Sequence, residues 1–382
     1  MVEKNDVSLE TQDSVDVKRN EPQLRFKEFT GELSKKSLYE IAKINPKTPK
    51  LPNEFIYIDL ESVVNGLLKK INKIKKNDAP SRAQRVLSKG DILFQTVRPY
   101  QKNNLFFNLD DDYYVASTGY AQIKSKINAK YLYQYFLTQN FVNEVLKRCT
   151  GTSYPAINSE DLKEIKLFIP TLEEQEKIAS FLSFIDNKIE LLEKTLVLYD
   201  KIEKHYIKKI YNNISDGEKI SLKNIFNVDS SNLSINSLEE NNGKYKLYGA
   251  EGVIKTIDFY EKMEPYISII KDGAGVGRLN LCDAYSSSLG TLQNLVPKEN
   301  FDINFLYFYL KTLNFQKYIV GSTIPHIYFR DYSKEKLSIP NIEKQKNIGN
   351  FFIYFEKRNI LLNNKIGCLT NFKKYLLQNM FI

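Results

Sequence analysis

The residues in this sequence best suited to chemistry are basic side chains that occur in clusters. Seven lysines and arginines lie between Lys69 and Arg85, and Arg98 and Lys102 follow. A lysine ammonium suits a phosphate, whereas the planar guanidinium of an arginine can also read the edge of a guanine. The cluster predicts contact with DNA, and a solvated loop is the alternative. The candidate contact residues here are Lys73, Lys75, Lys76, Arg82, Arg85, Arg98 and Lys102.

A second group of candidates surrounds a glycine-rich segment. Lys271 and Arg278 flank Asp272-Gly273-Ala274-Gly275-Val276-Gly277, and Thr323 and His326 lie in a later loop. A dinucleotide-binding fingerprint requires a helix that begins at the last glycine, but the residues that follow alternate like a strand. We therefore predict a hairpin loop rather than a cofactor site. Tight turning alone would explain the glycines, so an approach of this loop to a DNA backbone is left open.

The sequence contains no recognisable catalytic arrangement. It has no phosphate-binding loop, no Asn-Pro-Pro-aromatic segment of adenine methyltransferases and no nucleophile elbow. His205 and His326 are its only histidines, and without clustered cysteines or carboxylates they predict no metal site. Cys149, Cys282 and Cys368 are widely spaced, and we expect small buried hydrophobic residues in a reducing compartment. The expectation is a non-catalytic chain without a cofactor of its own.

The positive charge is distributed unevenly. The 382 residues, enough for two or three domains, carry a net charge of +9. Residues 21–170 hold 24 basic and 16 acidic side chains, and residues 341–382 hold seven and two. Residues 216–340, with 14 and 15, are close to neutral. A polyanion would therefore lie against the first globular part and the last helix, although a lysine-rich solvated surface has the same composition.

The N-terminal residues and the hydropathy of the sequence indicate the cellular compartment. Residues 1–20 are polar and mixed in charge, which predicts a disordered leader and not a signal peptide. No uncharged apolar run is long enough to span a membrane. We therefore expect a cytoplasmic protein.

The elements that must position these residues are organised around one long helix. Apolar residues from Ile178 onward recur in alternating steps of four and three, which is the seam of a coiled coil. Pro170 precedes Thr171-Leu172-Glu173-Glu174, which reads as a capping box. At about 1.5 Å per residue, a helix from Thr171 to Tyr211 would be roughly 60 Å long. The seam residues of this helix are Ile178, Leu182, Ile185, Ile189, Leu192 and Leu196.

Much of this helix, and of the loop before it, occurs twice at an offset of 170 residues. The segment Gly151-Thr152-Ser153-Tyr154-Pro155 corresponds to Gly321-Ser322-Thr323-Ile324-Pro325, and Ile169-Pro170 to Ile339-Pro340. The register holds without a gap for about sixty residues, which indicates a duplication. The second seam consists of Ile348, Phe352, Phe355, Leu362, Ile366 and Leu369. Asn359 also lies in it, either as a register-setting residue or in a frayed, solvent-facing turn.

Each long helix follows a globular part of similar build. Both parts combine short strands with a helical segment, from Ala129 to about Arg148 in the first and from Asn304 to Ile319 in the second. We predict a leader (1–20), a first domain (21–170), a first helix (171–215), a second domain (216–340) and a second helix (341–382). The fold class is α/β (α+β). The simplest burial of two apolar seams is an antiparallel helix pair with a pseudo-twofold axis. Such a chain could read two separated marks on a linear polymer.

Several short motifs accompany the duplication. They are Gln23-Leu24-Arg25-Phe26, Pro80-Ser81-Arg82-Ala83, Gly90-Asp91-Ile92-Leu93, Val97-Arg98-Pro99, Tyr248-Gly249-Ala250 and Asp272-Gly273-Ala274-Gly275, with Gly-x-x-x-Pro and Ile-Pro-x-x-Glu-x-Gln-x-x-Ile closing each half. In this order, and duplicated, they cover nearly the whole chain. The sequence resembles the specificity (S) subunits of type I restriction-modification enzymes.

The resemblance implies a function and a set of partners. The globular parts would be target recognition domains, each reading one half of a bipartite sequence in double-stranded DNA, and the helices would space them and dock partner subunits. Two modification (methyltransferase) subunits would use S-adenosylmethionine. Restriction subunits, with ATP and Mg, would translocate and cut DNA. Two alternatives from other classes are a coiled-coil adaptor between proteins and a single-chain modification methyltransferase.

Overall fold

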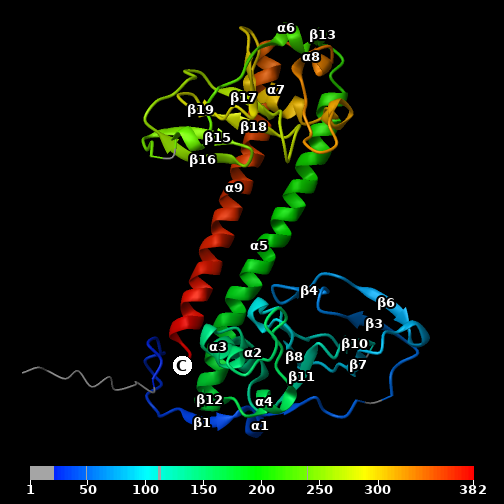
Figure 1. The fold of residues 1–382 in the computed structure, drawn as a ribbon, viewed down its shortest axis with the longest axis vertical. Coiled ribbons are helices and arrows are strands. Elements are labelled where there is room, and N and C mark those ends of the chain that lie inside the picture. The colour runs from blue at the N-terminus through cyan, green and yellow to red at the C-terminus, as the bar shows by residue number, and fades with distance from the viewer. Residues whose placement is uncertain (1–20, 49, 111–112, 239) are drawn as a thin grey trace, which may run out of the picture. The chain divides into compact units, whose positions relative to one another are not determined.

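The computed structural model describes residues 21–48, 50–110, 113–238 and 240–382 (Figure 1). The chain forms two compact units. Unit 1 comprises residues 1–191 and 366–382, and unit 2 comprises residues 192–365. Each unit therefore joins one globular domain to a part of each long helix.

The domain of unit 1 consists of short strands arranged in small sheets. Two four-stranded sheets have the orders β6-β3-β10-β7 and β2-β11-β8-β9, and β1 pairs with β12 and β4 with β5. The strands are β1 (Ser34–Ser37), β2 (Ala42–Ile44), β3 (Glu54–Ile58), β4 (Val63–Val64), β5 (Leu67–Leu68), β6 (Asn72–Lys75), β7 (Ala83–Val86), β8 (Ile92–Gln95), β9 (Leu105–Phe106), β10 (Tyr114–Ser117), β11 (Tyr120–Ser125) and β12 (Lys166–Ile169). The short helices are α1 (Leu38–Ile41), η1 (Lys76–Asp78), η2 (Pro99–Gln101), α2 (Ala129–Phe136), α3 (Gln139–Leu146) and α4 (Ser159–Lys163).

The domain of unit 2 repeats this plan. Its four-stranded sheet has the order β14-β20-β17-β18, beside a three-stranded sheet β16-β15-β19 and the pair β13-β21. The strands are β13 (Glu218–Ser221), β14 (Phe226–Asp229), β15 (Tyr245–Gly249), β16 (Gly252–Ile257), β17 (Tyr266–Ile270), β18 (Leu279–Cys282), β19 (Ser287–Ser288), β20 (Leu292–Pro297) and β21 (Lys336–Ile339). The short helices are α6 (Leu222–Ile225), η3 (Asn236–Leu238), α7 (Ile303–Leu310), η4 (Phe315–Tyr318) and α8 (Phe329–Tyr332).

The duplication predicted from the sequence extends to the strand pairing. In unit 1 the first and last strands of the domain, β1 and β12, pair antiparallel with Ser34 opposite Ile169. In unit 2 the equivalent strands β13 and β21 pair antiparallel with Glu218 opposite Ile339. The sheets β2-β11-β8-β9 and β14-β20-β17-β18 have the same order and the same antiparallel sense. The two domains are therefore versions of one fold.

The two single helices predicted within the domains are wrong. The segment from Ala129 to Arg148 breaks at Thr138, whose buried hydroxyl accepts a hydrogen bond from the main-chain nitrogen of Phe141 at 3.3 Å and so starts a second helix. A threonine that caps a new helix stabilises that break. In unit 2, α7 ends at Leu310, and the 3-10 helix η4 follows it after a turn. Apolar spacing alone does not reveal such an interruption, because both pieces carry buried apolar residues.

The long helices are α5 (Leu172–Asn212) and α9 (Ile342–Asn379). The capping box predicted for α5 is half correct, because the Thr171 hydroxyl accepts from the Glu174 nitrogen at 3.4 Å but the Glu174 carboxylate binds Arg25. The two hydrogen bonds to Arg25 measure 2.8 and 2.7 Å. For α9, the Asn341 side chain accepts from the Lys344 nitrogen at 2.9 Å. Both helices therefore begin where the sequence predicts.

Within each unit the two long helices run antiparallel. In unit 1, Ile178, Leu182 and Ile185 of α5 share one buried core with Leu376 of α9, and Asp186 pairs with Lys373 at 2.5 Å. In unit 2 the Asn359 amide of α9 donates to Asp200 and Glu203 of α5 at 3.1 and 3.3 Å. Asn359 therefore faces the other helix and is not in a frayed turn.

Most buried members of the predicted seam lie where a long helix joins a domain, and Leu192 is a buried member outside both domain cores. Of its members, Ile178, Leu182, Ile185, Leu192 and Phe352 are buried, while Ile189, Leu196, Ile348, Phe355, Leu362, Ile366 and Leu369 are half-buried. Phe352 stacks on Tyr211, with ring centroids 5.8 Å apart, inside the core of unit 2. Domain burial therefore stabilises the ends of the helices more than helix-to-helix contact does.

The cysteine prediction is only partly right. Cys282 is buried beside Tyr266, and burial raises the pKa of its thiol to about 12. Cys149 is half-buried, whereas Cys368 is exposed on α9. A lone cysteine on a surface position of a long helix gives no sequence signal that separates it from a buried one.

Candidate nucleic-acid interface

In unit 1 the end of strand β8 is bonded to the loop before α4. We call residues 96–98 together with residues 150–157 junction 1. The main-chain nitrogen of Arg98 donates to the Pro155 oxygen at 2.8 Å, and the Ile157 nitrogen donates to the Thr96 oxygen at 3.1 Å. Gly151 takes the positive φ of +87° that this tight loop requires. The loop is therefore fixed to the sheet through backbone hydrogen bonds.

Arg98 is the charged side chain of junction 1, and it is half-buried. Its backbone is in the left-handed region, with φ of 55°. Its guanidinium lies 4.3 Å from the centre of the Tyr154 ring, and Tyr154 is largely exposed. Such stacking holds a guanidinium in one orientation while its N–H edge can still donate.

Arg98 is among the residues that line a cavity of about 370 Å³, whose wall combines apolar side chains with polar ones. Gln95, which is 1% exposed, lines it and donates to the Val97 oxygen at 2.7 Å and to Gln101 Oε1 at 2.8 Å. The Gln95 side-chain oxygen accepts from the Asn103 nitrogen at 3.2 Å. These bonds fix the Gln95 amide in one orientation within the cavity wall.

Lys102 is engaged inside the domain. Its ammonium donates to the Leu137 oxygen at the end of α2 at 2.9 Å and to Gln139 Oε1 at 3.1 Å. Burial, with a smaller contribution from Lys374, lowers the pKa of Lys102. In this arrangement Lys102 caps a helix end, which is a favourable place for a cation.

The other candidates of unit 1 lie on the sheet β6-β3-β10-β7. Lys73 and Lys75 are exposed on the edge strand β6, where Lys73 pairs with Glu54 at 3.0 Å, and the half-buried Lys76 begins η1. Exposed Arg82 precedes β7, the opposite edge strand. The sequence cluster is thereby divided between two edges of one sheet and junction 1.

Arg85 on β7 is half-buried and unusual in its surroundings. Its Nε atom is buried without a hydrogen-bond partner among the described residues. Burial lowers the pKa of this guanidinium.

Unit 2 contains the equivalent junction. We call residues 271–273 together with residues 320–327 junction 2. The Gly273 nitrogen donates to the Pro325 oxygen at 3.0 Å, and His326 Nδ1 lies 2.7 Å from Asp272 Oδ1. The His326 ring is nearly parallel to that of Tyr328, with centroids 6.5 Å apart. Thr323 is exposed at the tip of the loop.

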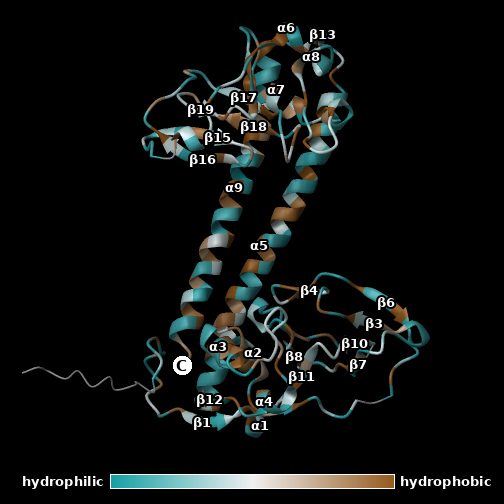
Figure 2. Ribbon diagram, viewed as in Figure 1, coloured by the Kyte–Doolittle hydropathy of each residue, from teal (hydrophilic) through white to brown (hydrophobic). Residues whose placement is uncertain are grey.

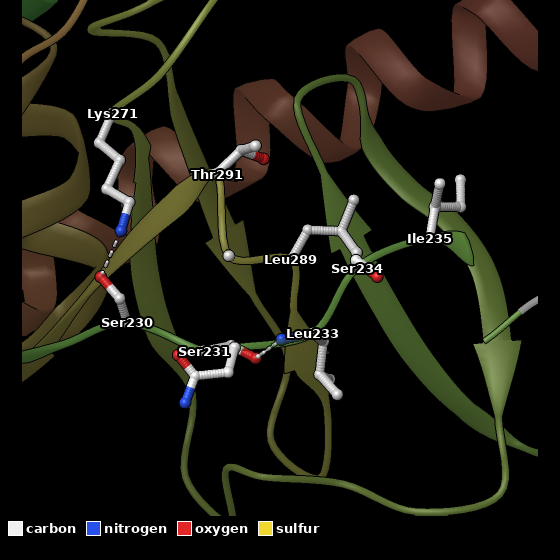
Figure 3. Close-up of a pocket in the computed structure, with 10 residues that line it drawn as sticks. Ser230, Ser231, Leu233, Ser234, Ile235, Lys271, Leu289 and Thr291 are labelled. Atoms are coloured by element: carbon white, nitrogen blue, oxygen red, sulfur yellow. Dashed lines mark hydrogen bonds between the residues drawn. The ribbon is translucent and has the colours of Figure 1, made fainter. Parts of the chain in front are cut away.

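Lys271 lines a cavity of about 530 Å³ in which hydroxyl side chains alternate with apolar ones (Figure 3). Its ammonium donates to the Ser230 hydroxyl at 3.1 Å. Ser231, Ser234 and Thr291 also line the cavity. One ammonium among hydroxyl donors suits a phosphate oxygen. Sequence reasoning missed these serines, because the run from Ser230 to Ser237 reads as an ordinary polar turn.

The glycine-rich segment is a hairpin loop, as the sequence predicts. Strands β17 and β18 pair antiparallel across it, with Ile269 opposite Leu279. Gly273, Gly275 and Gly277 have φ values of +86°, +89° and +87°, which explains their residue type. Exposed Arg278 donates through Nε to the Gly275 oxygen at 3.4 Å.

The structure thus gathers some candidates and separates others. Arg98 contacts Tyr154, and Lys271, Thr323 and His326 all lie in junction 2. Sequence reasoning missed Tyr154, although it lies in the repeated loop. Within residues 21–48, 50–110, 113–238 and 240–382, no group of three or more metal-ligating side chains occurs. Nor does any helix in that part of the chain have the length and apolarity to cross a membrane.

The fold and these junctions define a duplicated chain in which one α/β domain and one long helix occur twice. Residues 31–198 and 214–370 match the family model described as the type I restriction modification DNA specificity domain. The chain belongs to this family.

Three curated relatives show the extent of the similarity. The HindI specificity subunit of Haemophilus influenzae is 29% identical over 142 residues, which is 36% of this chain and 31% of that protein. The MjaVIII specificity subunit of Methanocaldococcus jannaschii is 31% identical over 148 residues, or 37% and 34%. The putative type I specificity subunit S.MpnORF507P of Mycoplasma pneumoniae is 28% identical over 246 residues, or 60% and 65%. The matched segments span about a third of the first two relatives.

Solved structures support the fold. The S subunit of a type I restriction-modification system from M. genitalium superimposes with a TM-score of 0.69 at 18% identity, covering 95% of this chain and 99% of that chain. A second chain, from a study of complex assembly and conformational transition of the type I R-M system, gives a TM-score of 0.54 at 19% identity, covering 91% and 97%. The fold is therefore shared over most of the chain.

Proposed function

We propose that this chain is the DNA-sequence-reading subunit of a type I restriction-modification complex, and that each domain binds one half of a bipartite duplex target. The observation that carries the proposal is the repeated domain with its junction, present twice on one scaffold. Family membership supports the same function. The net charge of +8 over residues 21–170 favours the first domain as the stronger contact to the DNA backbone.

The proposal gives the long helices two roles. As a pair they set the spacing between the two half-sites. They also dock partner subunits, and an exposed apolar stripe supports this role. Phe184, Leu191 and Leu198 recur at heptad spacing on α5, and Tyr354 and Leu361 do so on α9. Figure 2 shows hydrophobic residues recurring along both helices.

The repeat also bears on how many partners dock. Phe184 and Leu191 correspond to Tyr354 and Leu361 at the 170-residue offset. Two equivalent stripes fit two copies of one partner, which we take to be the modification subunit. Restriction subunits would join this assembly. S-adenosylmethionine, ATP and Mg would be bound by those partners, and this cytoplasmic chain would itself be non-catalytic.

A domain exchange tests the proposal. Replacing residues 216–340 by the corresponding domain of a relative is expected to change one half of the recognised sequence, because each domain reads independently. Sequencing of methylated DNA from cells that hold the chain and its partners would measure this. An unchanged target, or a wholly new one, would contradict the assignment of one half-site to each domain.

Two further measurements separate the alternatives. A protein adaptor has no reason to bind duplex DNA in a manner that depends on both salt and sequence, whereas a DNA reader shows both dependences. Methylation by the purified chain with S-adenosylmethionine alone would identify a single-chain methyltransferase.

A further inference from the structure

The two junctions share their backbone hydrogen bonds. Arg98 to Pro155 in junction 1 corresponds to Gly273 to Pro325 in junction 2, at 2.8 and 3.0 Å. The bond from Ile157 to Thr96, at 3.1 Å, corresponds to that from Ile327 to Lys271, at 2.9 Å. In each loop one glycine has a φ close to +90°, Gly151 or Gly321. The two junctions therefore share the same backbone hydrogen bonds and the same glycine conformation.

The side chains carried by this scaffold differ. Junction 1 has Arg98 where junction 2 has Gly273, and Tyr154 where junction 2 has Ile324. Ala156 of junction 1 is replaced by His326, which pairs with Asp272. Contacts that position a protein on DNA can be the same in both halves of a bipartite target, but contacts that read different bases must differ. The junctions have this combination of a common scaffold and different presented groups.

Junction 1 presents a group with a defined base preference. The Arg98 guanidinium is held over Tyr154 at 4.3 Å, beside a cavity wall in which Gln95 is locked by hydrogen bonds. A fixed guanidinium can donate two parallel hydrogen bonds to O6 and N7 of guanine, and few other groups on DNA accept both. The backbone of Arg98 is left-handed, and the equivalent residue of junction 2, Gly273, also has a positive φ.

We propose that the junctions are the base-reading sites of the two domains, and that Arg98, oriented by Tyr154, reads a guanine in the half-site of domain 1. Junction 2 presents no guanidinium at the equivalent position and reads a different base through the Asp272 and His326 pair. This inference rests on the proposed function and adds to it the residues that discriminate between bases.

Two substitutions of Arg98 test the inference in the complex assembled with its modification subunits. Arg98→Gly matches the residue and the sign of φ at Gly273, so the fold is expected to be retained. Arg98→Lys keeps the charge but loses the planar fork. Both variants are expected to relax one guanine position in one half-site, with discrimination against other bases falling about tenfold or more. The other half-site and the spacer length should be unchanged.

Lys35→Ala is the matched control. Lys35 is an exposed cation of the same domain and also lies over an aromatic ring, 5.3 Å from the centre of Phe168, but on β1 and outside the junction. Its removal is expected to leave the methylated motif unchanged. The thermal unfolding temperature of Arg98→Gly, measured alongside, should equal or exceed that of the wild type.

The readout is the methylated motif, obtained by sequencing DNA from cells that express each complex. An unchanged motif in both Arg98 variants would overturn the inference, as would a loss of methylation that is uniform over all sequences, since that pattern marks a phosphate contact. A wild-type complex that methylates no bipartite motif would overturn the proposed function instead.

Discussion

At the scale of single residues, Arg98 adopts a left-handed backbone conformation that residues other than glycine rarely adopt. A left-handed φ in a residue other than glycine costs on the order of 1 kcal/mol or more, and the duplicate scaffold avoids this cost with Gly273. Strained residues of this kind persist where the side chain they present is needed. The strain at Arg98 is therefore consistent with a reading role.

The start of α5 depends on one buried ion pair. The Glu174 side chain is 2% exposed, and Arg25 forms a two-pronged contact with it at 2.7 and 2.8 Å. The hydrogen bond to Glu174 raises the pKa of Arg25. At the equivalent helix position in unit 2, Lys344 pairs with Asp216 at 2.7 Å, but both side chains are largely exposed. The duplication thus offers a buried pair and an exposed pair at the same structural position.

We predict that Arg25→Ala destabilises the protein by about 3 kcal/mol, because it leaves the buried Glu174 carboxylate without its partner. Lys344→Ala, as the matched control, should change stability little, since exposed pairs contribute little. Chemical denaturation of both variants, monitored by circular dichroism, measures the difference in their free energies of unfolding. Equal effects of the two substitutions would show that burial does not govern this pair.

At the scale of elements, the end of α9 is part of the core of unit 1. Phe381, just past α9, packs against Tyr131 and Tyr135 of α2, with ring centroids 5.4 and 5.3 Å apart. The Tyr135 hydroxyl donates to the main-chain oxygen of Ile382 at 2.7 Å. The end of α9 therefore stabilises the first domain. A substitution in this contact should lower the stability of both α2 and the end of α9.

The buried tyrosine makes stability depend on alkaline pH. Burial raises the pKa of Tyr135 to about 12, so the folded state favours the protonated hydroxyl. Its contribution is fully present below pH 10, the ordinary tyrosine value, and is lost as the pH rises towards 12. In Tyr135→Phe we expect a loss of about 1 kcal/mol at neutral pH, from the missing hydrogen bond, and a shallower decline above pH 10.

Denaturation midpoints between pH 7 and 12 test this expectation. Tyr39→Phe is the control, because Tyr39 is exposed on α1. A pH dependence in Tyr135→Phe as steep as in the wild type would rule out Tyr135 as a source of the decline.

At the scale of the whole molecule, the proposed role of α5 and α9 as a spacer can be measured. One heptad inserted into each helix at positions related by the repeat, after Lys194 and after Asn364, preserves both seams. Seven residues lengthen a helix by about 10 Å, which equals about three base pairs at roughly 3.4 Å each. The spacer between the methylated half-sites should grow by about three base pairs, with the half-sites unchanged. A spacer of unaltered length would show that α5 and α9 do not set the distance between the half-sites.

Features that repeat or are periodic could be predicted from the sequence. The duplication, the start of both long helices, their seams and the hairpin at Gly273 all follow from local spacing, because helix periodicity, capping residues and glycine preferences act over a few positions. The family resemblance followed from the same motifs. The apparent helix from Ala129 to Arg148 shows the limit of this reasoning, since the cap at Thr138 looks like any polar position in a helix.

The sequence by itself thus determined that one domain and one helix occur twice, and it predicted an apolar seam on each helix. The tertiary structure alone decided which basic residues are presented and which are used internally. Arg98 meets Tyr154 because backbone bonds join two segments more than fifty positions apart, while Lys102, four residues after Arg98, caps a helix end instead. Contacts between distant segments depend on how strands and loops pack, and no local pattern of residue types records that packing.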